Sequence, residues 1–90
     1  MKRYQFIVKG RVQGVGFRAF TQQKAAQLGL TGYVMNQMDN SVEIEAQGEE
    51  NTLTKFQSAL QNGSPFSAVD EVQAQEKQVH DHERSFSIRY

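Results

Sequence analysis

The amino-acid sequence predicts an α+β fold in which two helices cover one face of a mainly antiparallel β-sheet. Residues 4–9 and 41–47 each alternate between apolar and polar side chains, the pattern of strands that are covered on one face only. Residues 17–28 and 53–60 instead repeat apolar side chains at helical spacing. A chain of 90 residues, 38% of them hydrophobic, has enough apolar side chains for one core and too few for two. We therefore expect residues 1–90 to form a single domain.

The first part of the chain predicts a strand, a glycine-rich loop and a helix. The side chains that share one face of the strand at residues 4–9 are Tyr4, Phe6 and Val8. Three glycines interrupt residues 10–16, whereas residues 17–28 contain no glycine or proline and therefore favour a helix. The apolar stripe of this helix consists of Phe17, Phe20, Ala25 and Leu28. Gly29 then suits the helix C-terminus.

The middle of the chain predicts a β-hairpin. Residues 31–38 are rich in β-branched and aromatic side chains, Asp39 and Asn40 form a two-residue turn signal, and residues 41–47 alternate. In the second strand the inward-facing residues are Val42, Ile44 and Ala46, and the outward-facing residues are Glu43, Glu45 and Gln47. The outward positions are typical of a solvated face, so we assign them no role and expect helices to cover the other face.

A second helix and two further strands complete the pattern. The helix opens within residues 48–51, where two glutamates suit the positive end of the helix dipole, and Asn62 and Gly63 end it. Residues 69–79 form a polar strand, and residues 86–90 alternate in a short final strand. The order βαββαβ with a short terminal strand is that of a ferredoxin-like α/β sandwich, in which the first two strands end at the same sheet edge.

Charge and composition exclude several classes of function. Ten basic and ten acidic residues give a net charge of zero, so no overall field attracts nucleic acid or anionic membranes, and any anion site must be local. Without cysteine there is no disulfide, thiolate nucleophile or cysteine-bound zinc. No apolar run approaches the roughly 20 residues that span a bilayer, and the N-terminal segment lacks a signal-peptide pattern. We expect a soluble, cytoplasmic monomer with no nucleic-acid or membrane partner.

Residues 10–18, with the sequence Gly-Arg-Val-Gln-Gly-Val-Gly-Phe-Arg, join the first strand to the first helix. Glycines permit positive φ angles and bring backbone N–H groups close to a ligand, and the start of a helix adds unpaired N–H groups and a positive dipole end. Arg18, in the first helical turn, adds a guanidinium fork that matches two phosphate oxygens. The segment therefore predicts a local phosphate site.

Spacing alone leaves three other interpretations of this loop open. A nucleoside-triphosphate P-loop requires Gly-Lys-Ser/Thr, but Gly14 is followed by Val15 and Gly16, which leaves no magnesium ligand. The residues from Gly14 to Ala19 fit the Gly-x-Gly-x-x-Gly/Ala dinucleotide fingerprint, a weak pattern that belongs in a larger parallel sheet. In the third interpretation the glycines only make a turn and Arg18 is a solvated helix residue.

The same residues, 10–18, closely resemble the N-terminal signature of the acylphosphatase family, Gly-x-Val-Gln-Gly-Val-x-Phe-Arg. A second family segment is matched by Tyr-Val-Met-Asn at residues 33–36 and by the alternating strand at residues 41–47, and the resemblance extends to residues 86–90. It implies a ferredoxin-like sandwich that hydrolyses carboxylic acyl phosphates to carboxylate and inorganic phosphate without a metal or cofactor. It also implies that inorganic phosphate, the product, is a competitive inhibitor.

The resemblance further implies the residues of the site. Arg18 and Asn36 would be the catalytic pair, with Arg18 stabilising the charge of the phosphoryl group and Asn36 orienting the attacking water. The backbone N–H groups that would bind phosphate are those of Gln13, Gly14, Val15, Gly16 and Phe17. The chain departs from the family pattern at Met35, where a charged residue is commoner, and in its Asp39-Asn40 turn. Met35 bears on substrate preference or rate and not on the reaction, and we expect the turn to survive because Asn tolerates a positive φ angle.

Other features suggest weaker hypotheses. His80 and His82 have the alternate spacing of some metal sites, but without a third fixed ligand we interpret them as exposed loop residues and predict no metal. The terminal carboxylate of Tyr90 is a candidate for orienting Arg18. The main alternative function is a non-catalytic phosphate-binding or regulatory module of the same fold. RNA binding is disfavoured because the outward side chains of residues 41–47 are acidic or polar, not aromatic.

Overall fold

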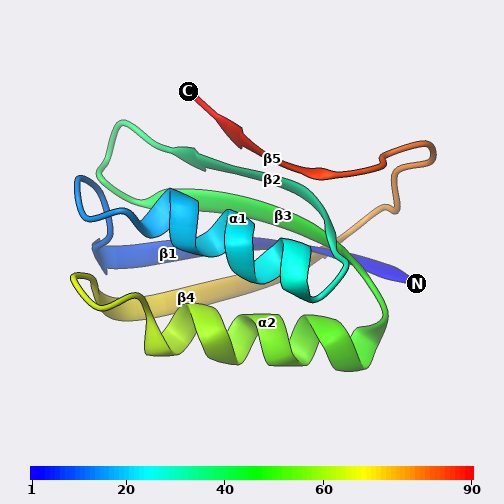
Figure 1. Cartoon of the computed structure of the whole chain (residues 1–90), viewed down its shortest axis with the longest axis horizontal. Helices are drawn as coiled ribbons and strands as arrows, with labels where there is room; N and C mark the ends of the chain where they lie inside the picture. The colour runs from blue at the N-terminus through cyan, green and yellow to red at the C-terminus, as the bar shows by residue number, and fades with distance from the viewer.

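The computed structural model describes all of residues 1–90 and shows five strands and two helices. In chain order these are β1 (Lys2–Arg11), α1 (Phe17–Gln27), β2 (Thr31–Asn36), β3 (Val42–Gly48), α2 (Glu50–Asn62), β4 (Ala68–Lys77) and β5 (Phe86–Arg89). The strands form one sheet in the order β4-β1-β3-β2-β5, and both helices cover the same face of it (Figure 1). The predicted α+β class and ferredoxin-like sandwich are confirmed. Neither helix is long and apolar enough to cross a membrane.

The register of the strands brings several chain ends to one edge of the sheet. β3 is antiparallel to both of its neighbours, so β1 and β2 run in the same direction and end at the same edge. β5 is parallel to β2, with Arg89 opposite Met35, so its C-terminal end approaches that edge too. Figure 1 shows the loop after β1 and the turn after β2 at one end of the molecule, with β5 pointing toward that end.

The core lies between the sheet and the helices. Strand residues that point toward the helices, such as Val42 and Ile44 in β3, are fully buried, and burying a side chain of this size contributes roughly 1.5–3 kcal/mol. The ring of Phe56 in α2 makes edge contacts with Phe6 and Phe86, at centroid distances of 5.9 and 6.1 Å, and so ties the helix to β1 and β5. The buried core cluster contains Phe6, Val8, Val12, Phe17, Ala25, Leu30, Val34, Val42, Ile44, Ala46, Leu53, Phe56, Leu60 and Phe86.

The buried stripe of α1 differs from the predicted one. Its fully buried residues are Phe17, Thr21 and Ala25, whereas Phe20 and Leu28 are half-buried. Thr21 is tolerated in the core because its hydroxyl donates a hydrogen bond to the carbonyl of Phe17 (Oγ1···O 2.8 Å). A hydroxyl that is satisfied within its own helix packs like an apolar group, which hydrophobic spacing does not reveal.

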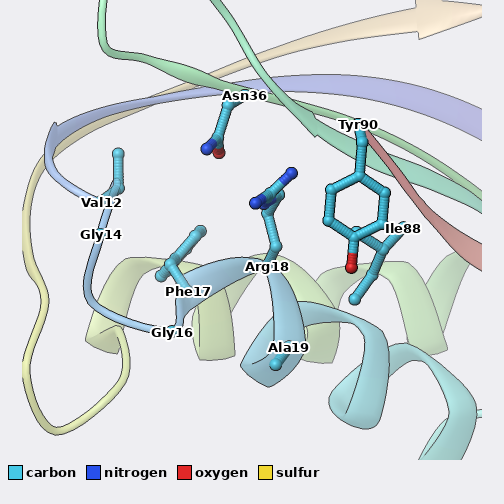
Figure 2. A pocket seen from close by; sticks show the side chains of 9 residues that line it. All are labelled: Val12, Gly14, Gly16, Phe17, Arg18, Ala19, Asn36, Ile88 and Tyr90. Atoms are coloured by element: carbon cyan, nitrogen blue, oxygen red, sulfur yellow. The ribbon is translucent and has the colours of Figure 1, made fainter.

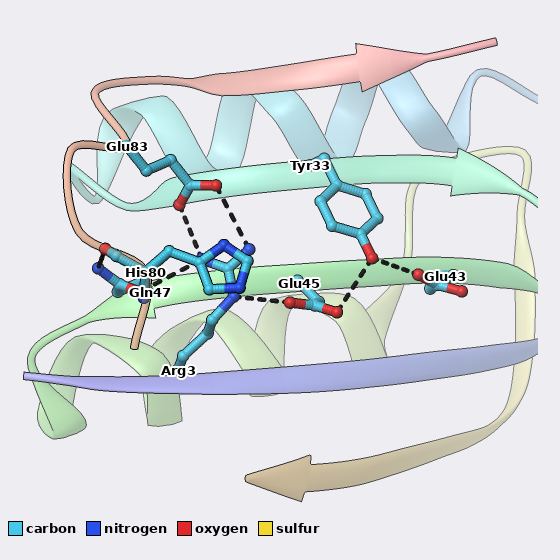
Figure 3. A network of polar contacts seen from close by, with 7 residues as sticks. All are labelled: Arg3, Tyr33, Glu43, Glu45, Gln47, His80 and Glu83. Carbon is cyan, nitrogen blue, oxygen red and sulfur yellow. Dashed lines mark hydrogen bonds and ion pairs between the residues drawn. The ribbon is translucent and has the colours of Figure 1, made fainter. Parts of the chain in front are cut away.

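The sheet face opposite the helices is not the solvated surface that the sequence predicts (Figure 3). The side chain of Arg3 is fully buried on this face, where its Nε donates to Glu45 (2.6 Å) and its two Nη atoms donate to the carboxylate of Glu83 (2.8 and 3.3 Å). Gln47 is also buried: it accepts from Arg3 and exchanges two hydrogen bonds with the backbone of His80. The prediction of a solvated face is wrong because the segment between β4 and β5 folds over this end of the sheet.

The carboxylates of this network have altered acidity. Burial acts to raise the pKa of Glu45 and of Glu83, but the hydrogen bonds and charge of Arg3 outweigh it and hold both pKa values below the ordinary 4.5. Burial, together with contacts to Glu43 and Glu45, raises the pKa of the Tyr33 hydroxyl. Because folding lowers the two carboxyl pKa values, the stabilisation is complete above the ordinary value and is lost as the pH falls through the lowered ones.

We predict that Arg3→Met lowers the free energy of unfolding by about 3–5 kcal/mol at neutral pH, because two half-buried carboxylates lose their partner. Lys2→Met is the matched control, since the ion pair of Lys2 with Glu50 is solvent-exposed and its loss should change stability little. Urea denaturation measures both variants.

The wild type should also lose stability as the pH drops below 4.5, and Arg3→Met should lack most of that loss. If Arg3→Met and Lys2→Met lost equal amounts of stability at neutral pH, the stabilising role given to the Arg3 network would be contradicted.

Candidate active site

A cavity of about 190 Å³ opens where the loop after β1 meets the C-terminal ends of β2 and β5. Its lining residues are Val12, Gly14, Gly16, Phe17, Arg18, Ala19, Asn36, Ile88 and Tyr90. They come from the loop, the first turn of α1, the end of β2 and the end of the chain (Figure 2). None of these side chains is acidic and one is basic, so the lining favours an anion.

The loop between β1 and α1 carries backbone N–H groups that have no partner within the protein. Gly14 and Gly16 have φ angles of 71° and 76°, in the left-handed region that L side chains rarely adopt. Gly16 is the N-cap of α1, and no side chain caps this helix. Of the backbone hydrogen bonds outside the helices and strands, none is donated by residues 13–19. The loop and the helix start therefore form a concave set of free donors at the positive end of a helix dipole.

Arg18 extends from the first turn of α1 into the cavity (Figure 2). Its Nη1 donates to the backbone carbonyl of Arg89 (3.1 Å), and its guanidinium lies 4.6 Å from the centre of the Tyr90 ring. The ion pairs of the protein do not include Arg18, so no carboxylate neutralises its charge. The orienting groups are thus the carbonyl of Arg89 and the ring of Tyr90, and not the terminal carboxylate that the sequence suggested. The guanidinium is oriented and free to bind an anion.

Asn36 is the last residue of β2, which ends earlier than the sequence predicts. Figure 2 shows its side chain pointing into the space between Arg18 and the loop. Its amide oxygen Oδ1 is buried and accepts no hydrogen bond from the protein. A buried acceptor without a partner is unfavourable by roughly 1–3 kcal/mol and is rare in folded proteins, so this oxygen has unused hydrogen-bonding capacity beside the cavity.

The structure brings most of the predicted site residues together. The predicted residues that line the cavity are Gly14, Gly16, Phe17, Arg18 and Asn36. Gln13 and Val15 belong to the same loop but not to the lining. The side chain of Gln13 instead donates to the backbone carbonyls of Gln37 and Ser41, in the turn between β2 and β3.

Sequence reasoning placed the chain end near Arg18 through the carboxylate of Tyr90, but it missed Ile88 and the Tyr90 ring as parts of the lining. Ile88 and the ring of Tyr90 form one wall of the cavity, although they are far from the loop in the sequence. The alternation in residues 86–90 indicated a strand, but not its partner. The parallel pairing of β5 with β2 places these two side chains beside Arg18.

The chain has no group of three or more His, Cys, Asp or Glu side chains that could hold a metal ion. His80 and His82 follow β4, at the end of the sheet opposite to the loop after β1 (Figure 1). The lining of the cavity itself contains neither a carboxylate nor an imidazole side chain, and these are the side chains that commonly bind Mg²⁺ or Zn²⁺.

The comparisons with known proteins agree on one family. The acylphosphatase family model matches residues 4–88. Over 90 residues the chain is 49% identical to an acylphosphatase of Bacillus licheniformis, with both chains covered completely. The crystal structure of an acylphosphatase from Bacillus subtilis is 48% identical over the whole of both chains, with a TM-score of 0.95. An acylphosphatase structure from Coxiella burnetii has a TM-score of 0.92 at 36% identity and covers 98% of this chain and 92% of its own. The chain therefore belongs to the acylphosphatase family.

Proposed function

We propose that this protein hydrolyses carboxylic acyl phosphates to a carboxylate and inorganic phosphate. The supporting observation is that three kinds of free group meet in one cavity: loop N–H donors, the guanidinium of Arg18 and the amide oxygen of Asn36. The first two suit the oxygens of a phosphoryl group, and the third suits a water molecule. The names of the relatives agree with this reaction.

The loop and Arg18 would bind the phosphoryl group. Its oxygens would accept hydrogen bonds from the backbone N–H groups of Gln13, Gly14, Val15, Gly16 and Phe17. Arg18 would add a charged, forked contact to the same oxygens. As the bond to the leaving group breaks, negative charge spreads over these oxygens, and donors fixed in advance stabilise that charge without reorganising.

Asn36 would position the attacking water. Its Oδ1 accepts a hydrogen bond from the water, whose oxygen attacks phosphorus on the side opposite to the acyl oxygen. The bond between phosphorus and the acyl oxygen breaks, and its electron pair leaves with the carboxylate. An amide is too weak a base to remove a proton from water. One water proton therefore passes to a phosphoryl oxygen of the substrate, the other stays on the attacking oxygen, and the product is inorganic phosphate.

The chemistry of the substrate explains why this set of groups suffices. The leaving carboxylate is the conjugate base of an acid with a pKa of about 4, so it departs without a general acid. Arg18 and the loop N–H groups supply the charge stabilisation that a metal ion provides in other phosphoryl transfers. We propose that the reaction needs no metal, that one chain carries the whole site, and that inorganic phosphate competes with the substrate for the same donors.

We predict that the purified protein hydrolyses benzoyl phosphate at the same rate with and without excess EDTA. A stable phosphate monoester should be hydrolysed at least about a hundredfold more slowly, because its alkoxide or phenolate leaving group needs proton donation that the site lacks. Continuous absorbance assays measure both substrates. Inhibition by EDTA would refute metal independence. Retained phosphate binding without any turnover would favour the non-catalytic module.

Variants at the two catalytic positions should separate binding from chemistry. Arg18→Ala should lower kcat/KM by about a hundredfold or more and weaken inhibition by phosphate, because the charge that binds the phosphoryl oxygens is lost. Asn36→Ala should lower kcat by a similar factor while leaving phosphate inhibition within about twofold of wild type. Lys24→Ala, in the last turn of the same helix, is the control and should change neither. Full activity in Asn36→Ala would remove the role given to that residue.

A further inference from the structure

The side chain of Gln13 joins the phosphate loop to the turn that follows Asn36. Its Nε2 donates to the backbone carbonyls of Gln37 (2.8 Å) and Ser41 (2.9 Å). Gln37 is the residue directly after Asn36 in the chain. The side chains of residues 12–16 make these two hydrogen bonds to the rest of the protein. One carboxamide therefore makes the polar connection between the loop and the Asn36 side of the cavity.

The turn that accepts these bonds is closed by bonds of its own. The N–H of Gln37 donates to the carbonyl of Ser41 (2.9 Å), and the N–H of Asn40 donates to the carbonyl of Gln37 (3.2 Å). A carbonyl oxygen has two lone pairs, so Gln13 uses the second acceptor site of each. The carboxylate of Asp39 also accepts from the N–H of Ser41 (3.0 Å). Gln13 is therefore attached to a fixed partner.

Apolar packing is what holds the rest of the loop. Val12 at its start and Phe17 at its end are each 1% exposed and anchored in the core. Between them, Gly14 and Gly16 are exposed, and a Cβ atom added at either would contact nothing within 4 Å. Val15, between the two glycines, is partly buried and packs against the core. These apolar contacts are not directional, whereas the carboxamide of Gln13 makes two directed hydrogen bonds to the turn after β2.

We propose that Gln13 is a positioning residue that sets the distance and angle between the loop N–H groups and Asn36. This inference rests on the proposed function, in which the loop holds phosphorus and Asn36 holds the attacking water. In-line attack requires the water oxygen to lie opposite the leaving oxygen of the bound phosphorus, and a displacement of about 1 Å can lower the rate by about a hundredfold. Gln13 acts through its side chain, in addition to its backbone N–H.

A double-mutant cycle with Gln13→Met and Asn36→Ala tests the proposal, because Met has similar length but no donor. In the wild-type background Gln13→Met should lower kcat by roughly tenfold to a hundredfold, with KM and phosphate inhibition changed less than about threefold. In the Asn36→Ala background the same change should lower kcat less than about threefold, because no positioned water remains to be misaligned. Gln22 lies on the same helix as Arg18 and donates a hydrogen bond to the backbone carbonyl of Phe86. Gln22→Met, which removes this bond, is the control and should show no such coupling.

Gln13→Glu provides a second test that does not depend on the Met variant folding. Its carboxylate would face two carbonyl oxygens, which raises its pKa above the ordinary value of about 4.3, and only the protonated form can donate to one of them. The kcat of Gln13→Glu relative to wild type should therefore rise as the pH is lowered from about 7 to about 5. A constant ratio would overturn the proposal.

The outcomes separate this inference from the proposed function. Effects that multiply in the double mutant, or phosphate inhibition that weakens as much as kcat falls, would show that Gln13 only keeps the loop folded and would overturn its role. A wild-type protein without turnover, or a fully active Asn36→Ala, would instead refute the proposed function itself.

Discussion

The N–H groups of residues 13–17 find no acceptor in the protein, and the rest of the site is arranged around that unmet hydrogen-bonding capacity. Gly14 and Gly16 turn the chain so that these groups face outward and do not pair internally. The core holds Val12 and Phe17 on either side, and α1 begins where the loop ends, so its dipole acts on the same space. Because the donors are exposed and fixed, they stay available to an anion at little cost to stability.

The strand β5 connects the two polar regions of the molecule. Three residues before it begins, Glu83 binds the buried Arg3, which fixes the segment between β4 and β5 on the open face of the sheet. At its end, the carbonyl of Arg89 and the ring of Tyr90 hold the guanidinium of Arg18. A short parallel edge strand thus extends from a charged network to the cavity at the opposite end, and its pairing with β2 keeps both in register.

Local signals in the sequence predicted the elements and the loop, because a glycine at a positive φ angle and a period of two or 3.6 act within a few residues. What could not be predicted depends on contacts between distant residues. Arg3 and Glu83 are 80 positions apart, so Glu43 and Glu45 seemed to be solvated when only their neighbours were considered. Thr21 was missed for the opposite reason. Its hydroxyl donates to a carbonyl one turn earlier in the same helix, and hydropathy does not take such a bond into account. The roles of Arg18 and Asn36 stay predictions, although the fold places both in one cavity.

The most direct test of this account follows backbone amide resonances while inorganic phosphate is added. The N–H signals of residues 13–17 should shift and those of α2 should not, and Gly16→Ala should bind phosphate at least about tenfold more weakly. Gly29→Ala places similar strain at a φ angle of 69° in equally open space beyond the other end of α1. It should lose a similar stability of about 1 kcal/mol and bind phosphate as the wild type does. Unchanged N–H signals of residues 13–17, or equal weakening by Gly29→Ala, would contradict the central claim that the loop N–H groups bind the phosphoryl group.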